Sequence, residues 1–439
     1  MIDPRIAFAS AIALLFPVIG AGCESSNKIV TPDRWVPTIT DEFDSGTAPS
    51  ADLWVIETGY GSDGWGNDEW QLYTDSPDNV RLEDGLLVIS AQCPEPPCGK
   101  RDGSITSARI KTQGLFQQEH GRFEARIKLP DGRGLWPAFW MLGANIEEVS
   151  WPNCGEIDVM ENFGRDPQVV SGSLHGPGYS GGQSISTEFP LSSDGTFSPT
   201  MNEASTGDWS GNLVVPVAGT SRLIKQANIG EGIVEPNDEV TVAFAVRGTL
   251  TGQTGAIYAE LLSEVDDGGV SKAETLGDGP IVPTGEWVTY SYTATAGDDV
   301  SAGLTFQLRA ECDAVERCGV DVYFDDVTVT TGGAELAING GFESETTAGW
   351  TVGTFADGFH IFHVEWDPSR ITYWVDGLFY RAVATSDVVA QGDWVFNQDF
   401  FALLNLAVGG NPVPSPDPAG TAFPAELLVD YVRIFERGK

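Results

Sequence analysis

The sequence predicts an all-β protein built from β-sandwiches. Short runs rich in Val, Ile, Phe, Tyr and Trp alternate with turn residues, and the chain contains 52 Gly and 26 Pro. Gly85–Ser90, Gly121–Lys128 and Ile371–Val375 are runs of this kind, and turn residues separate them. Because no long stretch has the hydrophobic period of an amphipathic helix, strands are expected to form nearly all of the regular structure.

Residues 198–354 differ in composition from the rest of the chain. Aromatic residues become rarer there, Thr, Val and Ala become more frequent, and acidic residues outnumber basic ones 24 to 6 over residues 198–353. Alternating strands are expected at Val240–Val246, Trp287–Tyr292 and Val320–Phe324. We predict that this segment is a smaller β-sandwich inserted into a discontinuous domain of residues 36–197 and 355–439, since insertion at an exposed loop is tolerated.

The overall charge restricts the partners. With 24 basic and 63 acidic residues, the chain has a formal net charge of -39. Such a charge argues against nucleic acid, anionic membrane surfaces and polyanionic substrates as partners. A neutral polymer is the expected substrate, and the chain is expected to act as a monomer.

The N-terminus has the features of an export signal. Arg5 precedes an apolar run, Ile6–Ile19, that is too short to span a bilayer. Residues 1–22 are therefore predicted to be a signal peptide. The small residues before Cys23 resemble a bacterial lipoprotein cleavage site, although Gly20 stands where a large aliphatic residue is usual. Residues 23–35 would form a tether that begins with lipidated Cys23 and holds an exported protein at the cell surface.

The remaining cysteines suit an exported protein. Two pairs at short spacing, Cys93–Cys98 and Cys312–Cys318, are expected to form local disulfides, and neither spacing resembles a zinc site. Cys154 is left over, and we interpret it as a packed thiol because no histidine stands near it in sequence.

The strongest candidate site is the segment Gly155–Asn162, which places three carboxylates in an otherwise apolar strand. Side chains alternate between the faces of a strand, so Glu156 and Asp158 share a face whereas Glu161 would point the opposite way. A β-bulge at Val159-Met160 would return Glu161 to the face of the other two acids. Carboxylates whose pKa values are pushed apart suit cleavage of a glycosidic bond. The alternatives are a half-exposed charged strand and a calcium site.

The chain resembles glycoside hydrolase family 16, in its laminarinase-like branch. The segments that carry the resemblance occur in the order of that family: Asp41–Asp44, Gly66–Tyr73, Thr106–Thr112, Gly121–Arg126, Gly134–Met141, Trp151–Glu161, Phe359–Trp366, Asn405–Gly410 and Val429–Ile434. The resemblance implies a curved β-jelly-roll sandwich with the active site on its concave face.

The resemblance also implies roles for the three acids. Glu156 would be the nucleophile, Glu161 the general acid/base, and Asp158 a helper bonded to the nucleophile. A retaining mechanism needs two carboxyl groups about 5 Å apart, which neighbours on one face of a strand can supply. Asp158 should help to keep Glu161 protonated while Glu156 is ionised. No cofactor is expected for catalysis.

Sugar-binding residues are expected around these acids. Trp136 and Trp140 are four residues apart and would share a face of a strand, where their flat rings suit the C–H faces of glucose; the alternative is that both are core residues. The resemblance favours a binding role for both, adds Trp151, and makes residues 174–182 a loop that lines the cleft. The candidates for bonding sugar hydroxyl groups are Asn67, Arg109 and His175.

Two further features are expected from family resemblances. A structural calcium ion would be held at Glu42, Gly85 and Asp430. The inserted segment resembles a family 4 carbohydrate-binding module, through Ala337–Glu343 and Val322–Val329, with its opening strand placed last. The insert is therefore either a sugar-binding module or a spacer.

The predicted function is an exported endo-β-1,3-glucanase that cleaves laminarin or a mixed-linkage β-glucan and retains anomeric configuration. One alternative is a related hydrolase of galactans such as agar or carrageenan, which the acidic surface disfavours if the polymer is sulfated. Another is a β-glucan-binding protein without activity. Such proteins typically lack the catalytic glutamates, whereas Glu156 and Glu161 are both present.

Overall fold

The structure of the chain is a computed structural model. It describes residues 35–191, 197–201, 203–215, 220–251, 255–265, 270–312, 319–343, 348–413 and 421–438. The predicted signal peptide, Cys23 and all of the tether except residue 35 lie outside the described residues.

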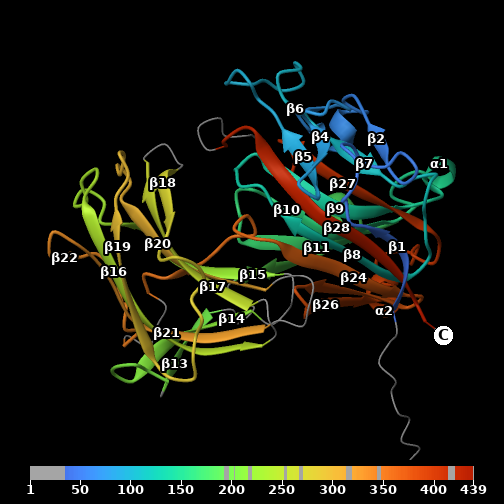
Figure 1. The fold of residues 1–439 in the computed structure, drawn as a ribbon. Helices are drawn as coiled ribbons and strands as arrows, with labels where there is room; N and C mark the ends of the chain where they lie inside the picture. Colours follow the sequence, from blue (N-terminus) through green and yellow to red (C-terminus); the bar gives the residue numbers. More distant parts are fainter. Residues whose placement is uncertain are drawn as a thin grey trace, which may run out of the picture.

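The outer segments form one sandwich of two large antiparallel sheets (Figure 1). The back sheet has the order β26 (Leu378–Ala384), β25 (Arg370–Val375), β24 (His360–Asp367), β8 (Gly121–Lys128), β28 (Ala425–Arg437), β5 (Leu86–Ala91) and β4 (Val80–Glu83), and β1 (Trp35–Asp41) also pairs with β28. The cleft sheet has the order β12 (Ile185–Pro190), β11 (Val169–His175), β10 (Glu156–Asn162), β9 (Leu135–Gly143), β27 (Phe400–Val408), β7 (Arg109–Lys111) and β2 (Val55–Glu57). Two short strands, β3 (Leu72–Tyr73) and β6 (Thr106–Ser107), form a parallel pair.

The two outer segments are interleaved within these sheets. Strand β8 lies between β24 and β28, and β9 pairs with β27, so strands from before and after the insert alternate. Alternation in β8 explains its position, because Phe123 and Ile127 are fully buried in the core whereas Arg126 is half-buried on the outer face. The outer segments therefore fold as a single discontinuous sandwich.

The inserted segment forms a second sandwich with its own core (Figure 1). One sheet has the order β13 (Phe197–Met201), β14 (Trp209–Val215), β21 (Gly319–Thr331), β16 (Glu239–Thr251) and β19 (Val288–Thr295), and β22 (Ala334–Glu335) pairs with β21. The other has the order β18 (Val270–Thr275), β17 (Gly255–Glu264), β20 (Leu304–Cys312), β15 (Ser221–Ile229) and β23 (Thr351–Val352). Because Phe197 pairs with Leu213, the first strand of this sandwich begins one residue before the predicted boundary.

Helices are few and short among the described residues. They are α1 (Ile146–Val149), α2 (Thr385–Val388), the π-helical turn η1 (Gly64–Asp68) and the 3₁₀ turn η2 (Gly181–Gln183). None of them is long and apolar enough to cross a membrane. The predicted all-β sandwich architecture is confirmed.

The cysteine predictions have separate outcomes. The Cys93–Cys98 disulfide is confirmed. Cys312 is disulfide-bonded, and its predicted partner Cys318 lies outside the described residues. Cys154 is a free, buried thiol whose pKa is raised to about 11, first by burial and then by the charge of Glu156. A thiol with a raised pKa is a poor nucleophile, which agrees with a packing role.

Candidate active site

Strand β10 contains the predicted bulge. Asp158 pairs with Ser173 of β11 and Glu161 pairs with Ser171, so β10 advances three residues while β11 advances two. The register against β9 also shifts, between Asp158 and Met160. Val159 and Met160 are both buried in the core, and the extra residue returns Glu161 to the face of the other acids. The bulge predicted from alternation alone is confirmed.

The three acids line a cleft of about 560 Å³ on the cleft sheet. The structure brings all nine predicted catalytic and sugar-binding side chains to this cleft: Glu156, Asp158, Glu161, Asn67, Arg109, Trp136, Trp140, Trp151 and His175. They come from η1, β7, β9, β10, β11 and the loop before β10, so distant parts of the sequence converge on one surface. The cleft also contains residues that sequence reasoning missed: Trp65, Glu69, Phe163, Ser173 and Asn405.

Glu156 receives its hydrogen bond from a tryptophan at the rim of the cleft. The indole N–H of Trp151, a residue that is 45% exposed, donates to Glu156 Oε2 over 3.1 Å. Burial raises the pKa of Glu156 to about 8, and the charges of Asp158 and Glu161 add to this effect. The nearby His175 and the Trp151 N–H act in the opposite direction.

The other two acids are also held towards their neutral forms. Burial raises the pKa of Glu161, although His175, the indole N–H of Trp136 and the hydroxyl of Ser173 oppose it. Burial and the charge of Glu161 hold the pKa of Asp158 well above its ordinary value. The expected separation between the pKa values of Glu156 and Glu161 therefore does not follow from burial, because burial raises the pKa of all three acids and they share their protons.

Trp136 combines packing with contact to the acid. It is 9% exposed and packs with Ala407 and Val413, and its indole N–H donates to Glu161 Oε1 over 3.0 Å. The core and cleft interpretations of this tryptophan are thus both partly right. Its position fixes one oxygen of Glu161 and leaves the other, Oε2, 3.5 Å from Ser173 Oγ.

His175 points at the acids. Its Nδ1 accepts a hydrogen bond from the backbone N–H of Gly181 over 3.2 Å, so the proton of the neutral ring is on Nε2. That Nε2 lies 3.2 Å from Asp158 Oδ2 and 3.5 Å from Glu156 Oε1. Glu156, Asp158 and His175 are close enough together to hold a metal ion. However, a protonated Nε2 offers no lone pair, and the site therefore favours a charge-stabilising role for His175.

A set of polar contacts fixes the orientation of Trp65 and Trp140 in the cleft. The guanidinium of Arg109 lies between the rings of Trp65 and Trp140, 4.6 Å and 4.8 Å from their centroids, and it is ion-paired with Glu57. The indole N–H of Trp140 donates to Asn405 Oδ1 over 2.7 Å. Arg109 therefore orients an aromatic ring as well as being available to a ligand.

The missed residues left some signal in the sequence. Asn405 opens Asn405–Gly410 and Glu69 lies in Gly66–Tyr73, two segments that carry the family resemblance. Their side chains are linked through Tyr73, whose hydroxyl accepts from Asn405 Nδ2 and donates to Glu69 Oε2, each over 3.2 Å. The motifs could have located these residues, but the hydrogen bonds depend on the three-dimensional fold.

The predicted calcium ligands do not fit a calcium site. Both carboxylate oxygens of Glu42 accept from Arg433, over 2.8 and 2.7 Å, and Asp430 is ion-paired with Arg126 at 2.9 Å. Calcium needs several oxygen ligands, and three of the four carboxylate oxygens of these two residues already accept from guanidinium groups. We derive no role for a metal ion from these residues or from Gly85.

Comparison with known proteins supports the family resemblance. The model of the family Glycosyl hydrolases family 16 matches residues 67–198 and 338–408. The chain is 44% identical over 165 residues to a glucan endo-1,3-beta-glucosidase of Cryptopygus antarcticus, covering 37% of this chain and 57% of that protein. It is 40% identical over 169 residues to a beta-glucanase of Rhodothermus marinus, covering 38% and 57%. The chain thus spans little more than half the length of these relatives.

Solved structures agree with these matches. The laminarinase catalytic domain of Thermotoga maritima superimposes with a TM-score of 0.52 at 26% identity, covering 92% of this chain and 99% of that one. An endo-beta-1,3-glucanase of Pyrococcus furiosus gives a TM-score of 0.52 at 28% identity, covering 92% and 97%. The residues that match the family model include the bulged strand β10 and the tryptophans Trp136, Trp140 and Trp151. The discontinuous sandwich of this chain is therefore similar to glycosyl hydrolase family 16 and to laminarinases.

Proposed function

We propose that the chain is an endo-acting β-1,3-glucan hydrolase that retains anomeric configuration. The observation that carries this proposal is the bulged strand β10, which presents three carboxylates on one face inside a cleft lined by tryptophans. The names of the relatives, a glucan endo-1,3-beta-glucosidase and a beta-glucanase, support a laminarin-type or mixed-linkage β-glucan as the substrate.

In the proposed mechanism, Glu156 attacks the anomeric carbon and Glu161 gives its proton to the departing glycosidic oxygen. Water then attacks the glycosyl–Glu156 ester, and Glu161 takes a proton from that water. The Trp151 N–H at 3.1 Å and the His175 N–H would stabilise the ionised form of Glu156. Burial favours the neutral form of Glu161 that the first step requires.

Asp158 would stay protonated between Glu156 and Glu161. It is 3% exposed, and its Oδ2 lies 3.2 Å from His175 Nε2 without the geometry of a hydrogen bond. A neutral carboxyl at this point limits the like-charge repulsion on Glu156 and Glu161. This is the proposed form of the helper role.

The cleft suits a neutral sugar chain. Trp136, Trp140 and Trp151 offer rings to the C–H faces of glucose, while Asn67 and Arg109 are available to hydroxyl groups. The net charge of -39 disfavours sulfated galactans, which are the substrate class of the second candidate. The third candidate, a glucan-binding protein without activity, would give no role to the arrangement of Glu156 and Glu161.

We further propose that the protein is exported, tethered through Cys23 and monomeric, and that the inserted sandwich is a carbohydrate-binding module. Its similarity to family 4 modules rests on the sequence segments alone. Deleting residues 198–353 in a chain that also carries Asp376→Asn, because Asp376 loses its partner Arg222, should spare turnover of soluble substrate. A large loss would show that the insert shapes the cleft. Mass spectrometry of the mature N-terminus would decide whether Cys23 carries lipid.

A reducing-sugar assay on laminarin, lichenan, curdlan and agarose tests the main proposal. Release from laminarin and curdlan is expected, and the anomeric form of the first product, followed by NMR, should match that of the substrate. Absence of release from every β-glucan would refute the proposal. Release from agarose alone would favour the galactan alternative.

A further inference from the structure

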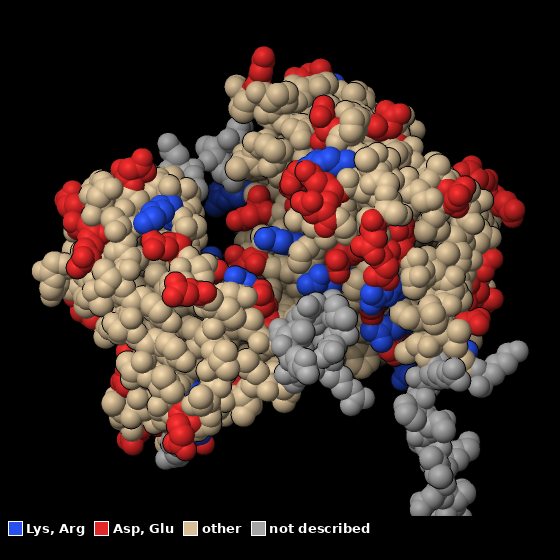
Figure 2. Space-filling view, viewed as in Figure 1, with Lys and Arg blue, Asp and Glu red and all other residues tan. Residues whose placement is uncertain are grey.

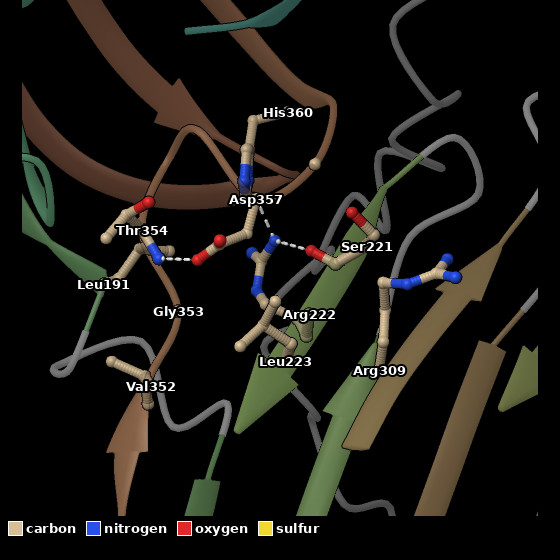
Figure 3. Close-up of a pocket in the computed structure, with 11 residues that line it drawn as sticks. Leu191, Ser221, Arg222, Leu223, Arg309, Val352, Gly353, Thr354, Asp357 and His360 are labelled. Carbon is tan, nitrogen blue, oxygen red and sulfur yellow. Dashed lines mark hydrogen bonds between the residues drawn. The ribbon is translucent and has the colours of Figure 1, made fainter. Parts of the chain in front are cut away.

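The two sandwiches meet at a buried ion cluster, of which Figure 3 shows Arg222 and His360. Arg222 of β15 enters the outer sandwich, where it forms an ion pair with Asp376 and lies 3.0 Å from His360 Nδ1. Asp376 is 0% exposed and accepts from the backbone N–H of Ile361 over 2.7 Å and from His360 over 2.8 Å. Although burial opposes its ionisation, Arg222 and His360 lower the pKa of Asp376 to about 2.

This ion cluster holds the insert and the outer sandwich in a fixed position relative to each other. A buried ion pair breaks only at a large cost, because it would leave an unpaired charge in the interior. A contact to the main chain adds to it, since Gln168 Nε2 of the outer sandwich donates to Val352 O of the insert over 3.1 Å. The orientation of the insert relative to the outer sandwich is therefore held by packed and charged contacts.

A cleft of about 560 Å³, which we call the junction cleft, lies next to this cluster. One wall is made by β8 and by residues 357–359 of the outer sandwich, and the other by β17, β20 and the start of β15. Its volume equals that of the cleft over the catalytic strand. Figure 2 shows basic and acidic side chains side by side in the hollow between the two sandwiches.

The lining of the junction cleft combines aromatic rings with planar polar groups. Arg126 lies over the ring of Phe359 at 4.4 Å, and Arg309 lies over the ring of Tyr258 at 4.5 Å. Stacked guanidinium groups hold both rings in fixed orientations. Lys128 and the Arg309–Glu311 ion pair place further donors and acceptors in the same space. Rings set among charged hydrogen-bonding groups are typical of sites that bind carbohydrate hydroxyls and C–H faces.

We propose that the junction cleft is a second binding site for a segment of neutral β-glucan. The arginines are neutralised by carboxylates, Arg126 by Asp430 and Arg309 by Glu260, so the lining suits hydroxyl groups better than a polyanion. Arg126 and Lys128 lie on the outer face of the back sheet, whereas the catalytic acids lie on the cleft sheet. The two sites would therefore hold different segments of one polymer and raise the local concentration of substrate.

This inference rests on the proposed glucanase activity, and the test keeps the two apart. The double variant Lys128→Ala/Tyr258→Ala removes one donor and one ring. Its matched control, Lys272→Ala/Tyr323→Ala, removes a lysine and a tyrosine stacked by Arg247 elsewhere on the insert. Both are made in the full chain with Glu156→Gln for pull-down on insoluble curdlan, and in the active chain for the ratio of curdlan hydrolysis to laminaritriose hydrolysis.

The junction variant should bind curdlan about fivefold more weakly and show a similar fall in the activity ratio, because the polymer loses its second attachment. The control should match the parent in both measurements. Unchanged curdlan binding by the junction variant, with thermal unfolding like the parent, overturns the proposal. Loss in the control alone would also overturn it and would place the site elsewhere on the insert. Failure of the glucanase proposal would be seen separately, as no sugar release by the active parent.

Discussion

The hydrogen bond from Trp151 to Glu156 gives the sharpest test of the catalytic roles. Glu156 has its pKa raised to about 8, and the Trp151 N–H at 3.1 Å is one of the influences that lower it. A nucleophile works in its ionised form, so kcat/KM should fall as the pH drops through the pKa of Glu156. Trp151→Phe keeps a ring at the rim and removes the donor. The pKa of Glu156 should rise, and the acid limb of the profile should move to higher pH.

The expected size follows from the strength of the lost bond. A net hydrogen bond is worth about 1 kcal/mol, and the free energy of moving a pKa by one is about 1.4 kcal/mol, so a shift of at most about 0.7 pH unit is expected. Trp151 is 45% exposed, and water will replace part of the lost bond. The assay is the initial rate on laminarin at low concentration between pH 4 and pH 10, after confirming that each variant is stable over that range.

Trp136→Phe is the matched control, because it removes the equivalent donor to Glu161. The general acid works in its protonated form, so a higher pKa for Glu161 should move the alkaline limb to higher pH and leave the acid limb nearly in place. The two variants should therefore move opposite limbs. If Trp151→Phe moved the alkaline limb and left the acid limb unchanged, Glu156 would not be the nucleophile.

Three further predictions test the charges of the molecule. Glu156→Gln should abolish hydrolysis and leave curdlan binding intact. In thermal unfolding it should also gain stability relative to the parent as the pH rises from 4.5 to 8, because Glu156 of the parent ionises in the unfolded state over this range while the folded state keeps it protonated. Arg222→Met should cost about 3–5 kcal/mol in chemical unfolding, since it strands the charge of Asp376, and adding Asp376→Leu should recover part of that loss. Treatment with EDTA should leave the melting temperature unchanged, because Glu42 and Asp430 are already ion-paired; a drop reversed by calcium would restore the calcium prediction.

Local pattern predicted the geometry of strand β10 well. Apolar residues at 157, 159 and 160 left a bulge as the way to place Glu161 beside Glu156, and the register of β10 shows that bulge. The spacing of Trp136 and Trp140 likewise predicted a shared face, and both line the cleft. Such predictions succeed because strand geometry depends on neighbouring residues.

The direction of His175 could not be predicted in this way. Its tautomer depends on the backbone N–H of Gly181, and its target depends on the pairing of β10 with β11. Local sequence indicated a polar residue near the cleft and suggested a sugar hydroxyl as its partner. The fold instead directs it towards Asp158 and Glu156, where it acts on the charge of the acids.

The insertion shows how distant residues share one structural task. Leu191, before the insert, donates its N–H to Gln168 O, and Phe355, after the insert, donates its N–H to Pro167 O. Both ends of the insert are therefore anchored on two adjacent residues, which explains why the outer sandwich can close around so long an interruption. Asp376, however, is buried in the outer sandwich with an arginine supplied by the insert. Removing the insert would leave that carboxylate without its guanidinium partner, so a test of the isolated outer sandwich needs Asp376→Asn in the same chain.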